Sequence, residues 1–297
     1  MPFPDYTDYQ KDYGDINKIT LTGSRGCVRR CSFCDIGAFW KKFRFRSGAN
    51  IAEEIIRNKN IYGSKTHFFS DSLINGSMKA FRDFCEVMAD YHEKHPKKSD
   101  RIRWGGQFII RSEKQSPAAD YTLMKKAGMT WASIGIESAS EAVRNHMDKQ
   151  FTNKDMYFSI DQLIKNDIRV TAMFIVGYPT EDEKEFQENI KWLEYYADRN
   201  SSKIPDPEKG KIGDINLGQT LGVLPNSPLA DMDVYNGRDT WVSKVVPGLD
   251  FEERVRRRKE LSRVANKLGY TVRWDEKQLH FLNRKLERWE RKGRPVR

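Results

Sequence analysis

Short stretches of alternating, β-branched or apolar residues recur along this chain, and stretches with helical spacing of apolar positions lie between them. This pattern predicts strands that alternate with amphipathic helices. Such alternation builds parallel sheets with right-handed crossovers, so we expect an α/β fold. The predicted strands cover residues 18–22, 66–70, 102–110, 130–136, 169–176 and 215–223, and the predicted helices cover residues 50–58, 77–92, 118–127, 153–166 and 181–198.

Six strands with polar residues just after them favour a partial (β/α)6 TIM-like barrel, whose site lies at the carboxyl ends of the strands. We expect the barrel over residues 17–230, after an extended N-terminal arm over residues 1–16. Residues 231–297 should form a basic, mainly helical C-terminal extension, with helices at about 253–268 and 275–292. The loop 200–213, rich in Lys, Pro, Gly and Ser, is a candidate lid.

The chain carries a formal charge of +10, from 52 basic and 42 acidic residues. Most of the excess lies in residues 251–297, which hold 16 Lys and Arg against 7 Asp and Glu. A segment of this kind can bind RNA, DNA, an acidic partner or an anionic membrane surface. It can equally be a solvated helix with ion pairs, and the charge alone leaves both readings open.

No apolar run approaches the ~18 residues of a membrane span, and the N-terminal residues have no features of a secretory signal. Four cysteines, three clustered and one remote, do not make a disulfide framework. We therefore expect no membrane association and a reducing, cytoplasmic location.

Three cysteines, Cys27, Cys31 and Cys34, follow the first predicted strand with the spacing C-x3-C-x2-C. Thiolates suit iron–sulfur clusters and zinc, and three of them leave one coordination position open for chemistry. A structural zinc site is disfavoured because a close fourth ligand and the usual paired spacing are missing. Cys85 belongs to the apolar stripe of the helix predicted at 77–92, so we expect a core thiol there. The five histidines form no metal-ligand pattern.

This cysteine motif after strand one of a β/α barrel resembles the radical S-adenosylmethionine (radical SAM) superfamily. Other segments match in order over about residues 19–229: Gly135-Ile-Glu-Ser138, Ile175-Val-Gly-Tyr-Pro-Thr-Glu181 and Leu224-Pro-Asn-Ser-Pro-Leu229. Arg46-Ser47 resembles the subgroup in which a cobalamin-binding domain precedes the barrel. Only about 16 residues precede the first strand here, so we expect any cobalamin to come from another chain.

The resemblance implies a [4Fe-4S] cluster, S-adenosylmethionine (SAM) and a one-electron donor of the flavodoxin or ferredoxin type. In this family the open iron chelates SAM, and reductive cleavage yields a 5′-deoxyadenosyl radical that abstracts hydrogen from a substrate in the barrel. Carried over by position, the cluster ligands are Cys27, Cys31 and Cys34, and the SAM contacts are Phe33, Ser70, Asp71, Ser72, Glu137, Ser138, Lys149, Gly177 and Tyr178.

The implied roles differ among these residues. Phe33 and the backbone at Gly177 and Tyr178 would lie near the adenine. Glu137 would meet the ribose or amino group of SAM, and Lys149 its carboxylate; the residues alone also allow a strand-end carboxylate and a solvated lysine. Residues 70–72 would approach the methionine moiety, although Asp71 is equally suited to capping the following turn.

The substrate is not specified by the sequence. The basic C-terminal helices and Lys41-Lys-Phe-Arg-Phe-Arg46, with its interleaved aromatics, would suit RNA, but Phe43 and Phe45 could equally be core residues. No cysteines remain for a second cluster, so we expect a single-cluster enzyme. The alternative is a non-catalytic iron–sulfur or zinc protein that binds nucleic acid through its C-terminal helices.

Overall fold

The computed structural model describes residues 2–199, 211–218, 221–237 and 240–274. Its centre is a seven-stranded sheet in the order β1-β4-β5-β6-β7-β8-β11, in which every pairing is parallel. The strands are β1 (Lys18–Leu21), β4 (Thr66–Phe69), β5 (Arg103–Phe108), β6 (Met129–Glu137), β7 (Arg169–Phe174), β8 (Ile212–Gly218) and β11 (Thr271–Trp274). The first six follow chain order across the sheet, which confirms the α/β fold and its partial barrel.

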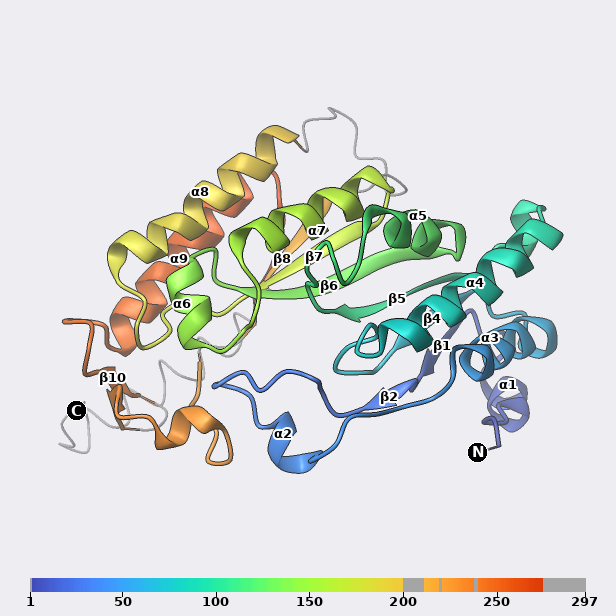
Figure 1. The fold of residues 1–297 in the computed structure, drawn as a ribbon, viewed down its shortest axis with the longest axis horizontal. Coiled ribbons are helices and arrows are strands. Elements are labelled where there is room, and N and C mark those ends of the chain that lie inside the picture. The colour runs from blue at the N-terminus through green and yellow to red at the C-terminus, as the bar shows by residue number, and fades with distance from the viewer. Residues whose placement is uncertain (1, 200–210, 219–220, 238–239, 275–297) are drawn as a thin grey trace.

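The helices between the strands lie along the outer side of the sheet (Figure 1). Three of these helices, α3, α4 and α7, have side-chain caps at their N-termini: Ser47, Ser77 and Thr152 each accept a hydrogen bond from a first-turn backbone N–H. These helices are α3 (Gly48–Tyr62), α4 (Met78–Lys94), α5 (Ala118–Lys126), α7 (Asn153–Lys165) and α8 (Glu183–Arg199).

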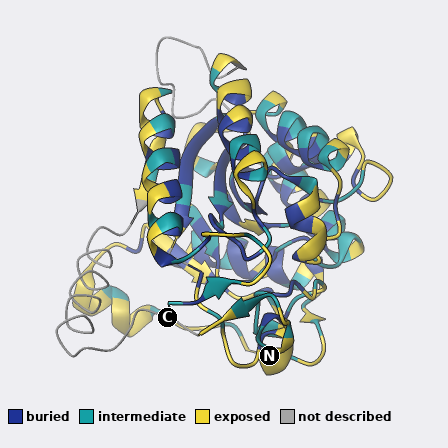
Figure 2. Cartoon of the chain, turned by 90° about the vertical axis from the view of Figure 1, so that its left-hand side faces the viewer, coloured by how far each residue is buried: buried dark blue, intermediate teal, exposed yellow. Residues whose placement is uncertain are grey.

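The two faces of the sheet have different chemistry. The face toward the helices is apolar: Phe69 of β4, for example, packs edge-on against Phe84 of α4 and Trp104 of β5. Figure 2 shows the strands as buried and the helices as exposed on their outer sides. Side chains alternate along a strand, so the register partners Gln107, Ser133, Thr171 and Asp214 form a polar row across four strands on the inner face.

The C-terminal region is part of this architecture. Helix α9 (Phe251–Lys267) packs on α8 and β8, and β11 adds a seventh strand beside β8. We predicted only helices here, although Thr-Val-Arg-Trp at 271–274 has the alternation of a strand. Residues 275–292, predicted as a second helix, and most of the candidate lid lie outside the described residues. The domain boundaries after residues 16 and 230 stay predictions.

The structure also corrects smaller predictions. The N-terminal arm contains a helix, α1 (Thr7–Tyr13), where we expected extended chain. Strand β8 begins at Ile212, three residues earlier than predicted, because Ile212 and Asp214 are buried in the protein. Several short elements were not predicted: α2 (Ile36–Phe39), α6 (Glu141–His146), the 3-10 turns at Lys98–Asp100 and Pro228–Asp231, and two small ribbons, β2 (Ser24–Arg25) with β3 (Arg44–Phe45) and β9 (Tyr235–Asn236) with β10 (Val242–Ser243). No helix in the described part of the chain is long and apolar enough to cross a membrane.

His67 is a buried titratable group in the middle of β4. Its side chain is 0% exposed, and neither ring nitrogen has a hydrogen-bond partner within the described residues. Burial disfavours the charged imidazolium and lowers the pKa of His67 from 6.5 to about 4.

His67 should therefore make the fold sensitive to acid. Between pH 6.5 and 4 the unfolded chain binds a proton at His67 and the folded chain does not. The free energy of unfolding therefore falls as the pH is lowered, by up to about 3 kcal/mol. His67→Leu should lose this dependence when cluster-free protein is unfolded in urea at several pH values. The exposed His95→Gln serves as control, and parallel curves for wild type and His67→Leu would contradict the assignment.

Candidate active site

The cysteine loop, Cys27–Cys34, lies at the carboxyl edge of the sheet, and Ser32 makes three of the contacts that tie it there. The backbone N–H of Ser32 donates to the carbonyl of Met147 (2.9 Å), and its carbonyl accepts from the N–H of Leu229 (2.7 Å). Its hydroxyl lies 2.8 Å from the hydroxyl of Tyr178. Three segments that follow β6, β7 and β8 thus converge on the middle of the cysteine motif.

The three thiols of this loop are unpaired. Cys31 is buried, whereas Cys27 and Cys34 are half-buried. Burial raises the pKa of Cys31 to about 11, although Lys149 acts in the opposite direction, and burial also raises the pKa of Cys34. The N–H of Arg29 points to the Cys27 sulfur at 3.4 Å, as suits a sulfur that carries negative charge when it binds metal.

These thiols do not form a site for a single metal ion. Within the described residues, no group of three or more His, Cys, Asp or Glu side chains could hold one ion. In an iron–sulfur cluster each thiolate binds its own iron, so the sulfurs need not converge on a point. The donor set and its loop therefore fit a cluster better than zinc. Cys85, in contrast, is 1% exposed within the apolar core, as predicted.

Glu137 and Lys149 form an ion pair beside the cysteine loop. The Lys149 Nζ lies 3.1 Å from Glu137 Oε1, and both residues are only 9% exposed. The same ammonium lies 5.8 Å from the centre of the Phe33 ring, between Cys31 and Cys34. The structure therefore brings Phe33 close to Glu137 and Lys149, which lie more than a hundred positions later in the sequence.

The backbone around this pair is unusual. Glu137, at the end of β6, has a φ of 64°, and Asp148 and Gln150, on either side of Lys149, have φ values of 54° and 56°. Non-glycine residues avoid this left-handed region, and such strain often gathers where side chains must be aimed at a ligand. A Cβ on Gly135 would lie 2.3 Å from Glu137 Oε1 and 3.1 Å from Lys149 Nζ. A side chain at 135 would therefore displace the Glu137 carboxylate from its place beside Lys149.

The segment after β4 supports the start of the site. Asp71 is 4% exposed, and its carboxylate accepts the backbone N–H of Gly23 (2.9 Å), directly before β2. Burial raises the pKa of Asp71, and hydrogen bonds from Ser24 and Gly23 oppose the shift. Ser70 donates to the carbonyl of Leu21 (3.0 Å). Ser72 is half-buried, and the structure shows no bond that defines its role. Asp71 thus holds the chain that leads into the cysteine loop.

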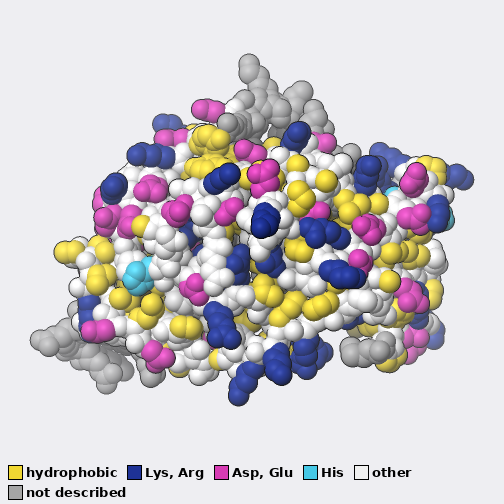
Figure 3. All heavy atoms as spheres, viewed as in Figure 1, with side chains coloured by type: hydrophobic (Ala, Val, Ile, Leu, Met, Phe, Trp, Pro, Cys, Tyr) yellow, Lys and Arg dark blue, Asp and Glu magenta, His cyan; other side chains and the backbone are white. Residues whose placement is uncertain are grey.

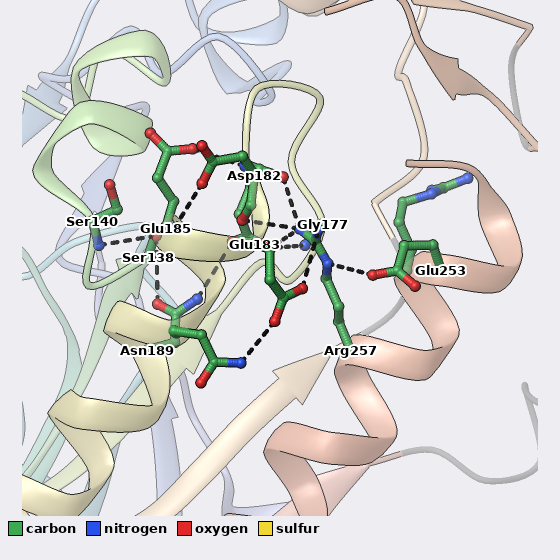
Figure 4. A network of polar contacts seen from close by, with 12 residues as sticks. Ser138, Ser140, Gly177, Asp182, Glu183, Glu185, Asn189, Glu253 and Arg257 are labelled. Atoms are coloured by element: carbon green, nitrogen blue, oxygen red, sulfur yellow. Dashed lines mark hydrogen bonds and ion pairs between the residues drawn. The ribbon is translucent and has the colours of Figure 1, made fainter. Parts of the chain in front are cut away.

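The turn after β7 is held by a buried carboxylate that we did not single out, Glu181. It is 0% exposed and accepts from the N–H of Gly177 (2.8 Å) and the amide of Asn189 (3.4 Å). Arg257 of α9 donates to the Glu181 carbonyl (2.7 Å) and lies 3.4 Å from its carboxylate. Figure 4 shows this network running from α9 to the turn.

The same network reaches the turn after β6. The side-chain oxygen of Asn189 accepts the N–H of Ala139 (2.7 Å) and lies 3.4 Å from the Ser138 hydroxyl (Figure 4). Ser138 is fully buried and its hydroxyl also accepts from the N–H of Ser140. The side chain of Ser138 is therefore bonded to Asn189 of α8. Through Asn189, this helix joins the ends of β6 and β7.

Helix α9 faces the protein with its arginines. Arg254, Arg257 and Arg258 are at most 3% exposed. Arg254 stacks on Trp241, 3.7 Å from the ring centre, and donates to the carbonyls of Leu221 and Trp241. Arg258 donates to the carbonyls of Leu217 and Gly218 at the end of β8. Their spacing of three and four residues places them on the face of the helix that also carries the buried Leu261 and Ala265, and this apolar spacing is the signal in the sequence that the face is buried.

A comparison with known families decides the identity of this site. A model of the radical SAM superfamily matches residues 21–193, more than half of the chain. The chain belongs to the radical SAM superfamily. The match contains the cysteine loop, Glu137, Lys149 and the turn after β7, whereas Leu229, which also bonds to Ser32, lies beyond it.

Named proteins with similar sequences include a cyclase and a methylthiotransferase. The anaerobic magnesium-protoporphyrin IX monomethyl ester cyclase of Cereibacter sphaeroides is 29% identical over 171 residues, 57% of this chain and 26% of the cyclase. The ribosomal protein uS12 methylthiotransferase RimO of Hydrogenobaculum sp. is 25% identical over 234 residues, 71% of this chain and 57% of that protein. The chain thus spans about a quarter of the cyclase and little more than half of the methylthiotransferase.

A solved structure supports the fold. The radical SAM methyltransferase TsrM of Kitasatospora setae superposes with a TM-score of 0.59 at 15% identity, over 76% of this chain and 39% of that one. Radical SAM enzymes use a [4Fe-4S] cluster and SAM, and both are therefore the cofactors of this chain. Reductive cleavage of SAM in this superfamily needs an external electron donor.

Glu181 offers a test of the network behind this site. Burial raises its pKa from 4.5 to about 7. Between these pH values the folded chain binds a proton that the unfolded chain has lost, so the free energy of unfolding falls as the pH rises, by up to about 3 kcal/mol. Glu181→Gln cannot titrate, and its stability relative to wild type should rise from pH 4.5 to 7.

The measurement is urea unfolding of cluster-free protein across this range. Glu194→Gln, at an exposed carboxylate further along α8, is the matched control and should follow the wild-type curve. An unchanged difference between Glu181→Gln and wild type at all pH values would contradict the buried, proton-binding carboxylate.

Proposed function

We propose that this chain is a single-cluster radical SAM enzyme whose cluster is bound by Cys27, Cys31 and Cys34. The observation that carries the proposal is the convergence at Ser32: the cysteine loop is fixed against the ends of β6, β7 and β8, with the Glu137–Lys149 pair beside it. When bound, the reduced cluster supplies the electron that cleaves SAM into methionine and a 5′-deoxyadenosyl radical. Cys85 stays in the core, so one iron lacks a protein ligand.

The residues around the loop have distinct proposed roles toward SAM. Lys149 provides a positive charge for the carboxylate, and Glu137 an acceptor for the ribose hydroxyls or the amino group. Phe33 lies beside the Lys149 ammonium, where its ring can contact the adenine. The backbone at Gly177 and Tyr178 is positioned to flank the adenine, because Glu181 fixes Gly177 and Ser32 binds the Tyr178 hydroxyl.

Residues 70–72 are proposed to hold the backbone around the SAM site in place, and to contribute less to SAM binding than Glu137 and Lys149. The Asp71 carboxylate is occupied by the N–H of Gly23, and Ser70 by the carbonyl of Leu21. Ser138 contributes through the bond between its turn and Asn189. These contacts fix the walls of the site, and only Ser72 among the four has no partner that competes with a ligand in the described structure.

The substrate is proposed to lie on the inner face of the sheet, over the polar row of Gln107, Ser133, Thr171 and Asp214. A radical at the carboxyl edge can reach a group held there, while the barrel wall limits its contact with water.

An RNA substrate bound through residues 251–297 loses part of its support. Three arginines of α9 are buried, and Arg256 pairs with Glu183, Glu253 and Glu260. The exposed cations on this helix are therefore fewer than its sequence indicates. RNA binding and the cytoplasmic location stay predictions.

The direct test is anaerobic reconstitution with iron and sulfide, followed by reduction in the presence of SAM. Wild-type protein should form 5′-deoxyadenosine, measured by mass spectrometry. Cys31→Ala should lose most of its cluster iron and this product, whereas the matched Cys85→Ala should retain both because its thiol lies in the core. Equal amounts of 5′-deoxyadenosine from Cys31→Ala and wild type would contradict the proposal.

Gly135→Ala tests the role of the Glu137–Lys149 pair. The added methyl group must displace Glu137 Oε1, which lies 2.3 Å from its position. SAM affinity should fall about tenfold or more, equivalent to ~1.4 kcal/mol, while the iron content stays that of wild type. Equilibrium dialysis measures the affinity. Gly222→Ala, where nothing lies within 4 Å of the new methyl group, is the control. Unchanged affinity in Gly135→Ala would remove the pair from the SAM site.

A further inference from the structure

A strongly basic surface lies next to the cysteine loop, and the site described above does not use it. Residues 24–46 contain seven Lys and Arg but a single carboxylate, Asp35. Figure 3 shows Lys and Arg side chains gathered at the lower edge of the molecule, where Figure 1 places α2 and β2. We call this surface the basic face, and its exposed cations are Arg25, Arg30, Lys41, Lys42 and Arg44.

Two of these cations are fixed in an arrangement that repels. Arg25 and Arg44 are directly opposite each other in the β2–β3 ribbon. Like charges in this position destabilise a ribbon. Both guanidinium groups lie over the Trp40 ring, at 5.6 and 5.2 Å from its centre, and this contact offsets part of the repulsion. The ribbon therefore presents paired positive charge to solvent in a defined geometry.

No carboxylate neutralises this charge. Within the described residues, none of the five exposed cations forms an ion pair. On α9, in contrast, the exposed Arg256 pairs with Glu253 and Glu260 of the same helix. An uncompensated group of one sign produces a field that attracts a partner of the opposite sign.

The basic face is continuous with the cysteine loop. A Cβ on Gly26, the residue before Cys27, would lie 3.1 Å from the Cβ of Trp40 and 3.2 Å from the carbonyl of Lys42. The segment that carries Trp40 and Lys42 therefore packs directly on the start of the loop. Arg30 lies within the loop itself, between the first two cysteines.

Large apolar side chains accompany the charges. Phe39 of α2 is 68% exposed, and Val28 of the cysteine loop is 38% exposed. Phe45 of β3 is 53% exposed, but it points to the side of the ribbon opposite Arg44 and stacks on Phe43. Exposed apolar groups close to charged ones are typical of protein interfaces.

We propose that the basic face is the docking surface for an acidic one-electron carrier protein of the flavodoxin or ferredoxin type. The proposal rests on the proposed function, because the electron has to enter at a cluster held by the cysteine loop. In the complex the reduced carrier loses one electron and the cluster gains it; no bond is formed or broken. A carrier bound to Phe39 and Val28 would lie close to the loop that binds the cluster. Electron transfer requires this closeness, whereas RNA binding does not.

The test measures how fast the reconstituted cluster is reduced by photoreduced flavodoxin, an acidic flavoprotein, in stopped-flow absorbance. Lys41→Glu with Lys42→Glu should lower the second-order rate about tenfold or more at low salt, because steering of this kind depends on charge. Raising the salt concentration should slow wild type and reduce the difference. The matched control reverses two exposed lysines of α9, Lys259→Glu with Lys267→Glu, and should react at the wild-type rate.

A second reductant separates docking from damage to the site. Photoreduced 5-deazariboflavin is small and uncharged, so it should reduce the clusters of wild type and both variants equally. The double variant Lys41→Gln with Lys42→Gln removes the two charges without reversing them and should be reduced by flavodoxin at an intermediate rate. It replaces the charge-reversal variant if that variant binds less iron than wild type.

The outcomes are distinct. If wild type reduced by deazariboflavin forms no 5′-deoxyadenosine, the proposed function fails. If it does form this product, but the Lys41 and Lys42 variants accept electrons from flavodoxin as fast as wild type, only the docking surface fails. Unchanged reduction together with loss of RNA retention in these variants would assign the basic face to RNA instead.

Discussion

The hydrogen bonds of Ser32 are the constraint on which the site depends. A loop with three cysteines has little structure of its own, and its sulfurs become a defined ligand set only when the backbone between them is fixed. Ser32 provides this by bonding to the carbonyl of Met147, the N–H of Leu229 and the hydroxyl of Tyr178. Each partner follows a different strand. The parallel sheet contributes the rest, because it brings the carboxyl ends of those strands to one edge.

A second layer of bonds holds those partners in turn. Glu181 fixes Gly177, the residue before Tyr178, and Arg257 fixes Glu181 from a helix that we had assigned to a separate extension. Arg254 and Arg258 bind carbonyl groups at and beyond the end of β8. Buried arginines are costly unless their donors are satisfied, and backbone carbonyls at strand ends have acceptors to spare. The C-terminal helix therefore stabilises the turns of the site, although it contributes no ligand.

Much of this could be predicted from the sequence, because periodicity reports which side chains face a core. The six strands, the helices between them and the core position of Cys85 follow from that signal, and the cysteine spacing with the Gly135–Ser138 motif indicates the family. The role of Glu181 and the burial of Arg254 and Arg257 were missed, since charge counts do not say which way a cation points. The strand at Thr271–Trp274 was missed although its residues alternate, because it lies between two segments that were both predicted as basic helices. The convergence on Ser32 depends on bonds between segments more than a hundred residues apart, which no local pattern contains.

The central claim is that these residues hold a cluster with one iron free for SAM. Electron paramagnetic resonance of the reduced, reconstituted protein, recorded with and without SAM, tests it most directly. The account predicts the signal of a single [4Fe-4S] cluster whose g-values change when SAM binds, because SAM coordinates the iron that lacks a thiolate. Spectra that are identical with and without SAM, from protein with a full complement of iron, would contradict it.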